Sequence, residues 1–122
     1  VTGFDRDPES VRVSIANRVD NGLADEAAVF HHAGLEEGFK LTGRADVVLA
    51  NIISDVLCIY ADNLVDSVNP GGVLALSGIL AKEQAAVREH FEAKAKAAWG
   101  EATTTDGRVM GEWSDVALFR PL

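Results

Sequence analysis

Two short apolar runs in the middle of the chain stand out from the polar segments around them. Residues 46–50 are rich in Val and Leu and stop at Asn51, and residues 73–77 form a second run that ends at Gly78. Short runs without polar alternation are typical of parallel strands that are covered on both faces. We therefore predict two buried strands here, with Asn51 at the carboxyl end of the first.

Helical patterns separate these runs. Asp7-Pro8-Glu9 predicts a helix start, because Asp caps free N–H groups and Pro suits the first helical position. Apolar residues then recur every four positions, and Asn21-Gly22 ends this helix. A second helix follows the run at 46–50, and a third is expected over about residues 81–98. Their predicted buried faces are Leu57, Tyr60, Ala61, Leu64, Val65 and Val68 in the second helix and Val87, Phe91 and Ala95 in the third.

The remaining segments carry weaker signals. Residues 27–30 are a shorter strand candidate, and residues 34–43 are polar and are predicted to form a loop with at most one helical turn. Asn69-Pro70-Gly71-Gly72 is expected to interrupt regular structure. Near the end of the chain, Asp106-Gly107 predicts a hairpin turn, and residues 116–119 predict the final strand.

Strand and helix thus alternate three times, starting with a strand over residues 1–4, before a terminal hairpin-like pair. Alternation predicts a mostly parallel sheet with helices on both faces, and the final pair predicts an antiparallel terminal strand. No repeat or linker interrupts residues 1–122. We therefore expect an α/β fold within a single domain.

Composition narrows the classes of protein that the chain fits. A formal net charge of -8 argues against a nucleic-acid-binding module and is compatible with a cationic partner. The single cysteine, Cys58, excludes an internal disulfide and fits a reducing compartment, here taken as the cytoplasm. No segment approaches the ~20 apolar residues needed to cross a membrane. The chain opens inside a predicted strand without a Met, which indicates the carboxyl-terminal part of a longer polypeptide.

Two polar residues at strand ends are candidates for chemistry. Asn51 follows a predicted central strand, where ligands gather in open α/β sheets, although it or Ser54 could instead cap the next helix. Asp5 follows the first strand, where an acid accepts hydrogen bonds from ribose hydroxyls in nucleotide-binding sheets, although it could equally be a loop acid or a helix cap. The adjacent His31 and His32 point to opposite faces of a strand, so no metal site is predicted.

Several segments, taken in order, carry a resemblance to a known family. They are Asp5-Arg6-Asp7-Pro8, Ala50-Asn51-Ile52, Asn69-Pro70-Gly71-Gly72, Ser77-Gly78-Ile79-Leu80 and Gly111-Glu112-Trp113. Together they are similar to the PrmA family, the lysine methyltransferases of ribosomal protein L-eleven in the class I S-adenosylmethionine-dependent superfamily. The resemblance covers essentially the whole chain and is weakest between residues 24 and 43.

The resemblance implies a Rossmann-like class I methyltransferase sheet and a protein substrate, namely a lysine or the amino terminus of a ribosomal protein, without direct contact to nucleic acid. It implies that Asp5 binds the ribose hydroxyls of S-adenosylmethionine. It also implies that Asn51 lies beside the methionine end of this cofactor and near the incoming amine, as the candidate catalytic residue. Trp113 would lie near the end of the sheet, packing rather than reacting.

One departure from the family pattern bears on activity. The chain holds no Gly-rich loop of the G-x-G-x-x-G type, and it begins at the family's second strand, without the amino-terminal recognition domain. In the superfamily the missing first strand lies in the middle of the sheet, so its absence would expose unpaired strand edges. We therefore expect self-association, or pairing with another chain, through these edges. The isolated segment is predicted to be inactive and to bind S-adenosylmethionine weakly or not at all.

Two other classes of function stay open. A nicotinamide-dependent oxidoreductase would use Asp5 in the same way, although the terminal antiparallel addition favours the methyltransferase. A non-catalytic α/β interaction module would keep the fold without the cofactor loop. Among methyltransferases, Asn51-Ile52-Ile53-Ser54 departs from the Asn-Pro-Pro-Tyr of enzymes that act on glutamine amides or bases, which favours a protein amine as substrate.

Overall fold

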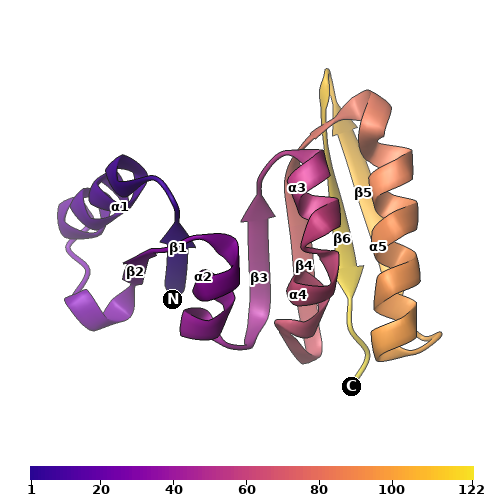
Figure 1. Ribbon diagram of the computed structural model, residues 1–122, viewed down its shortest axis with the longest axis horizontal. Coiled ribbons are helices and arrows are strands. Elements are labelled where there is room, and N and C mark those ends of the chain that lie inside the picture. Colours follow the sequence, from indigo (N-terminus) through magenta and orange to yellow (C-terminus); the bar gives the residue numbers. More distant parts are fainter. The chain divides into compact units, whose positions relative to one another are not determined.

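The computed structural model describes residues 1–122 and divides into two compact units, Val1–Gly43 and Arg44–Leu122 (Figure 1). Each unit is an α/β arrangement with its own sheet. No helix of either unit is long and apolar enough to span a bilayer. The expectation of a single domain over residues 1–122 stays a prediction.

The first unit is built on two parallel strands, β1 (Thr2–Asp5) and β2 (Val29–His32), which pair from Thr2 with Val29 to Asp5 with His32. The helices of this unit are α1 (Pro8–Asp20), the short 3-10 helix η1 (Asp25–Ala27) and α2 (Leu35–Thr42). Strand β2 lies two residues later than predicted, so that both histidines belong to it.

Helix α1 begins and ends where the sequence predicts. The side chain of Asp7 accepts the backbone N–H of Glu9 at 3.0 Å, Pro8 occupies the first turn, and Gly22 follows with φ of +67°. Its apolar stripe is not buried, however. No side chain of α1 is buried in this structure, and Ile15 is 38% exposed.

The prediction of a loop with at most one helical turn over residues 34–43 is wrong, because Leu35–Thr42 form helix α2. Gly34, Gly38 and Gly43, at both ends and in the middle of the segment, are unfavourable in helices and favoured the prediction of a loop. Gly38, in the middle of α2, is buried against the ring of Phe4, and a Cβ at this position would overlap that ring. The glycine is therefore a packing requirement between α2 and β1 rather than a loop signal.

The second unit is a four-stranded sheet in the order β3-β4-β6-β5. Its strands are β3 (Ala45–Asn51), β4 (Val68–Leu80), β5 (Thr104–Met110) and β6 (Trp113–Phe119), and its helices are α3 (Ser54–Ile59), α4 (Ala61–Asp66), the 3-10 helix η2 (Ala81–Glu83) and α5 (Gln84–Trp99). Strands β3 and β4 are parallel, whereas β6 is antiparallel to both of its neighbours. The predicted α/β fold with a mixed sheet and one antiparallel terminal strand is confirmed.

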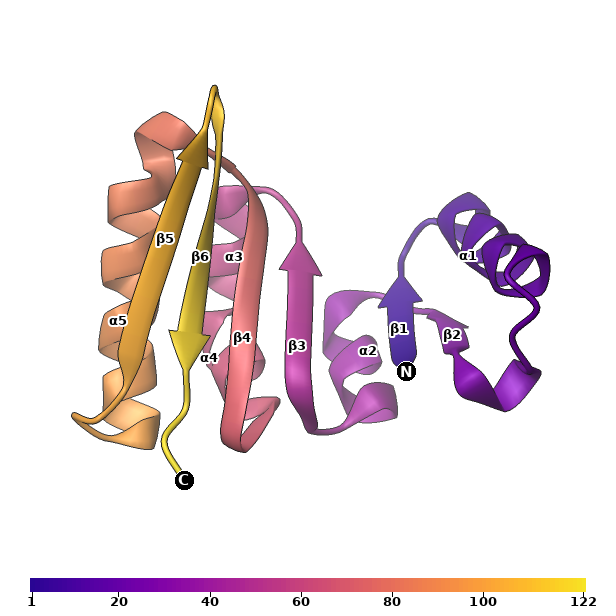
Figure 2. The same ribbon diagram turned by 180° about the vertical axis from the view of Figure 1, so that it is seen from behind.

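Within this unit all the helices lie against one face of the sheet (Figures 1 and 2). Side chains that alternate along β4 and β6 toward the helices are fully buried, such as Leu76 and Leu118, each 0% exposed. The opposite face, which we call the open face, includes Leu49 at 77% exposed and Phe119 at 44%. Within the second unit, helices therefore cover only one face of the sheet, and not both faces as predicted.

Two local predictions for the second unit are wrong, and one holds in part. The helix expected after residue 53 is two short helices that meet at Tyr60. The segment Asn69-Pro70-Gly71-Gly72 lies inside β4, but it interrupts the regular pairing as expected, because β4 pairs with β3 at Val68 and not again until Val73. Asp106-Gly107 lies inside β5, and the hairpin turns at residues 111–112 instead.

Packing explains the position of Gly107. A Cβ on this residue would lie 2.8 Å from Nε2 of Gln84 and 3.3 Å from Nη1 of Arg88, both on α5. The Gln84 amide donates hydrogen bonds to the carbonyls of Arg108 and Asp115 at 3.1 and 3.0 Å. Side chains of α5 thus pack closely over Gly107, and a Cβ at this position would force the Gln84 amide to shift.

Candidate functional site

Asn51 is the last residue of β3 and lies at the carboxyl end of the parallel strand pair, as predicted. It is exposed, and it is in register with Ser77 of β4. The alternation along β3 places Asn51 on the same face as Val47 and Leu49, the open face of the sheet. A side-chain amide thus stands at the edge of the sheet where ligands of α/β proteins gather.

The alternative prediction, that Asn51 or Ser54 caps the helix after β3, is wrong. Helix α3 has Ile53 at its N-cap position and no side-chain capping bond. The hydroxyl of Ser54 instead donates to Oε2 of Glu83 at 2.7 Å. This bond ties the segment after β3 to the segment after β4, so the two loops at this edge of the sheet are held together.

A glycine in β4 lies directly beneath the Asn51 side chain. Gly78 has φ of +76°, and a Cβ built on it would overlap Oδ1 of Asn51. Gly78 was predicted only as the end of a strand. The neighbouring Ser77 is exposed on the same edge. Sequence reasoning missed this contact, and the only local signal for it was a glycine following a buried strand.

The last hairpin closes the same edge of the second unit. The N–H of Ala81, just after β4, donates to the carbonyl of Glu112 at 2.7 Å. Trp113 starts β6 opposite Leu80, so it lies near the end of the sheet as the resemblance implies. The residue is 56% exposed, so it packs only in part.

Asp5 stands at the corresponding carboxyl end of β1 in the first unit. Its Oδ1 accepts the N–H of Asp7 at 2.8 Å, which holds the carboxylate in a turn before α1. The loop is further held by His32, whose Nε2 lies 3.0 Å from the carbonyl of Arg6. Asp5 is exposed and does not cap α1, since Asp7 does so.

These two residues suit the parts of an adenosyl sulfonium cofactor that the resemblance assigns to them. Asp5 retains Oδ2 and further lone pairs to accept hydrogen bonds from ribose hydroxyls. Asn51 presents a neutral, exposed amide with both an acceptor and donors. Asp5 belongs to the first unit and Asn51 to the second. Their convergence on one crevice stays a prediction.

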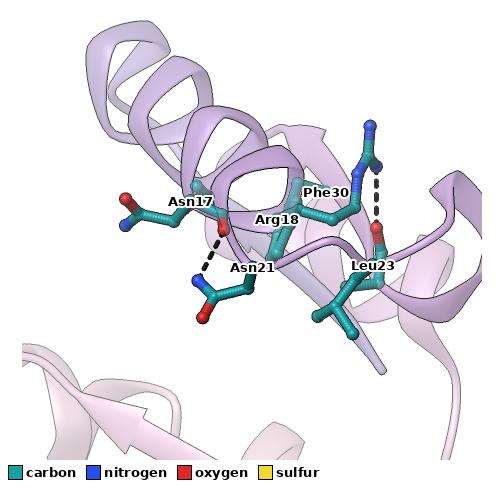
Figure 3. A pocket seen from close by; sticks show the side chains of 7 residues that line it. Asn17, Arg18, Asn21, Leu23 and Phe30 are labelled. Atoms are coloured by element: carbon teal, nitrogen blue, oxygen red, sulfur yellow. Dashed lines mark hydrogen bonds between the residues drawn. The ribbon is translucent and has the colours of Figure 1, made fainter.

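A pocket in the first unit lies away from Asp5. Figure 3 shows its lining, which comes from the second half of α1, from the segment between α1 and β2, and from Phe30 of β2. Nη1 of Arg18 donates to the carbonyl of Ala28 at 2.8 Å, and Nδ2 of Asn21 donates to the carbonyl of Asn17 at 2.7 Å. Because α1 runs back from the carboxyl end of β1, this pocket is not part of the predicted cofactor site.

Other reactive groups offer no competing site. No group of three or more His, Cys, Asp or Glu side chains in the structure could hold a metal ion. Burial raises the pKa of the Cys58 thiol, and the nearby Asp55 carboxylate raises it further. The thiol therefore stays protonated at neutral pH and is a poor nucleophile.

Comparison with known proteins agrees with this architecture. The family model of ribosomal protein L11 methyltransferase (PrmA) matches residues 1–116. The chain is 37% identical over 122 residues to the ribosomal protein L11 methyltransferase of Citrifermentans bemidjiense, covering 100% of this chain and 36% of that relative. It is 42% identical over 80 residues to that of Pelotomaculum thermopropionicum, covering 66% of this chain and 25% of the relative.

The fold is also that of solved methyltransferases. The crystal structure of ribosomal protein L11 methylase from Lactobacillus delbrueckii subsp. bulgaricus superposes with a TM-score of 0.81 at 21% identity, covering 100% of this chain and 58% of that one. A methyltransferase from Pyrococcus furiosus gives 0.70 at 19% identity, with 100% and 63% covered. The chain spans 25% to 36% of the length of the first curated relatives that it matches. The predicted resemblance is confirmed: the chain belongs to the ribosomal protein L11 methyltransferase (PrmA) family.

Proposed function

We propose that the protein containing this segment transfers a methyl group from S-adenosylmethionine to an amine of a ribosomal protein, either a lysine side chain or the amino terminus. One observation carries the proposal: in a chain of this family, an exposed carboxamide, Asn51, ends a parallel strand at the ligand-binding edge of the sheet. The cytoplasm is the proposed compartment, because a ribosomal protein is the proposed substrate.

When bound, the cofactor supplies an electrophilic methyl group on a sulfonium, and the chain supplies binding and orientation. Asp5 accepts hydrogen bonds from ribose hydroxyls through its carboxylate. The side-chain oxygen of Asn51 accepts an N–H of the neutral amine and directs the amine lone pair. The side-chain ammonium group of lysine has a pKa of about 10.4, so it must lose a proton before its nitrogen can accept the methyl group. Positioning of this kind supplies most of the rate that a displacement reaction needs.

The family match favours this function over the two alternatives, an oxidoreductase and a non-catalytic module. The isolated segment itself is proposed to bind S-adenosylmethionine weakly and to be inactive. It holds no Gly-rich loop of the usual type, and its two units separately contain only two and four strands. Calorimetric titration of residues 1–122 with S-adenosylmethionine checks this, and tight binding would contradict it.

In a full-length chain that contains this segment, the roles of Asp5 and Asn51 predict that different quantities change: kcat when Asn51 is replaced, and the cofactor Kd when Asp5 is replaced. Asn51→Ala should lower kcat about 100-fold, because the amine loses its orientation, and should change the Kd of S-adenosylmethionine by less than about threefold. Asp5→Asn should raise that Kd roughly tenfold or more, because a charge-assisted hydrogen bond is lost. Methyl transfer to the purified ribosomal protein and calorimetry with the cofactor measure both effects.

Two matched variants control for general damage. Asn69→Ala removes an amide of β4 that lies beside the start of β3, where Nδ2 of Asn69 donates to Oδ1 of Asp46 at 3.0 Å. Asp20→Asn neutralises an exposed acid of the first unit whose side chain forms no ion pair. Both should leave kcat and the cofactor Kd near the parent values. Equal losses of kcat and affinity in Asn51→Ala would contradict the proposed role of this residue.

A further inference from the structure

A β-bulge lies directly beside the proposed catalytic amide. Leu76 of β4 pairs with Val116 of β6, and Ile79 pairs with Ser114, so that Ser77 and Gly78 together oppose a single residue of β6. A bulge of this kind bends the strand and changes the direction of the side chains around it. It occurs here at the point where β4 passes the end of β3, since Ser77 is in register with Asn51.

Two independent features favour glycine at the second position of the bulge. Gly78 has φ of +76°, a conformation that side chains with a Cβ rarely adopt. Any Cβ at this position would also overlap Oδ1 of Asn51. The other close atoms, Cγ of Asn51 at 3.5 Å and the carbonyl oxygen of Ile52 at 3.7 Å, are at ordinary contact distances from such a Cβ. The steric conflict is therefore confined to the amide oxygen.

No hydrogen bond within the second unit fixes the orientation of the Asn51 amide, so only packing contacts can do so. Ser54, the nearest hydroxyl along the chain, bonds to Glu83, and no hydrogen bond of the unit involves the Asn51 side chain. The surface above Gly78 is thus the feature that defines where Oδ1 lies. A residue with a Cβ would force the Asn51 amide to move, whereas the backbone at Ile52, whose carbonyl oxygen is 3.7 Å from that Cβ position, would not need to move.

We propose that Gly78 is a positioning residue for Asn51. The bulge at Ser77-Gly78 provides a surface without a side chain, on which the carboxamide rests with its oxygen in the orientation that receives the substrate amine. This inference rests on the proposed function of Asn51. It adds that the orientation of the amide, and with it the turnover number, depends on a backbone feature of the neighbouring strand.

Gly78→Ala in a full-length chain that contains this segment tests the proposal. We expect kcat to fall about 10- to 100-fold with less than about threefold change in the Kd of S-adenosylmethionine, because the amide is displaced. The second readout is independent of activity: in a ¹⁵N-labelled protein the side-chain NH₂ resonances of Asn51, identified by their loss in Asn51→Ala, should shift. Gly111→Ala is the control for backbone strain, since Gly111 has φ of +61° and open space around its Cβ position.

A double variant separates positioning from general damage. In the Asn51→Ala background, Gly78→Ala should lower kcat by no more than about twofold further, because the oxygen that it would displace is gone. Gly78→Ala should also lower the free energy of unfolding less in the Asn51→Ala background than in the parent chain, because only the backbone strain at φ of +76° then remains. A full additional loss of kcat in the double variant, an equal loss of stability in both backgrounds, or unchanged Asn51 resonances would overturn the proposal. An unchanged kcat in Asn51→Ala would instead overturn the proposed function, whereas a resonance shift in Gly78→Ala would still report the contact.

Discussion

The two units of the chain differ in what holds them together. The second unit has a continuous apolar core in which Leu57, Leu74 and Phe91 are fully buried. The first unit buries only two apolar residues, Ala28 and Ala33, both of them small. A core of large side chains therefore supports the edge that carries Asn51, whereas the edge that carries Asp5 has no equivalent support within its own unit.

Local contacts take the place of a core in the first unit. Phe4 packs edge-to-face on Phe39 with their ring centroids 5.6 Å apart. Arg18, whose side chain is only 13% exposed, bonds to the carbonyl of Ala28 and pairs with Asp25 at 3.1 Å. Contacts of this kind each contribute about 1 kcal/mol. The proposed ribose-binding carboxylate therefore depends on a few weak contacts, and the proposed catalytic amide depends on a packed core.

The largest expected effect is in the core of the second unit. Phe91→Ala should lower the free energy of unfolding by about 3–5 kcal/mol, because Phe91 is 0% exposed and its removal leaves a cavity beneath the sheet. Guanidinium denaturation followed by tryptophan fluorescence measures the loss, since both tryptophans lie in this unit. Ile59→Ala, at a position 73% exposed in α3, is the control and should cost less than about 1 kcal/mol. Similar losses from both variants would contradict the assignment of the core.

A smaller effect is expected at the packing centre of the first unit. Replacing glycine by alanine within a helix ordinarily stabilises it by about 1 kcal/mol. Gly38→Ala should instead destabilise the first unit by about 1–3 kcal/mol, because the new methyl group overlaps the ring of Phe4. Hydrogen exchange measures this, with the amide of Ala33, which bonds to the carbonyl of Asp5 at 3.0 Å, as the reporter.

Gly34→Ala is the matched control for that variant. Gly34 precedes α2 with φ of −72°, and a Cβ on it meets no atom within 4 Å. It should leave the exchange rate of the Ala33 amide nearly unchanged. Slower exchange in Gly38→Ala than in the parent chain would show that the ring of Phe4 moves freely and that the first unit has no fixed packing centre.

The same difference between the units explains how far the sequence could be interpreted. The burial of Val87, Phe91 and Ala95 was predictable, because helical periodicity is a local pattern and their exposures are 3%, 0% and 0%. The position of Asn51 was predictable for a similar reason, since an apolar run ended there. Where packing depended on a glycine and a distant side chain, as at Gly38, local patterns predicted a loop instead of a helix.

Parts of the site could not be predicted for a related reason. The contact between Gly78 and Asn51 joins residues 27 positions apart through a bulge that no periodicity encodes. The bond from Ser54 to Glu83 likewise replaced an expected helix cap, because a distant carboxylate competed with the local N–H groups. Whether Asp5 and Asn51 face one cofactor depends on how the two units are placed, which is a long-range property.

The smallest expected effect is on the solvated side of α5, and it tests whether the surface of the second unit contributes less than its core. Lys96 donates a hydrogen bond to Glu92 at 2.9 Å, which lowers the pKa of the Glu92 carboxyl from its usual value of 4.5. Because the pKa is lower in the folded state, this pair stabilises the fold fully above about pH 4.5, and the contribution is lost as the pH falls through the folded pKa.

Lys96→Gln should raise the pKa of Glu92 toward 4.5 in a carbon-detected NMR titration. Lys94→Gln, which lies on the same helix as Lys96 but breaks a pair with Asp62 of α4, should leave the pKa of Glu92 unchanged. If Lys96→Gln shifted the unfolding midpoint at pH 7 as far as Phe91→Ala does, the surface would contribute as much as the core, and the distinction between the two would be wrong.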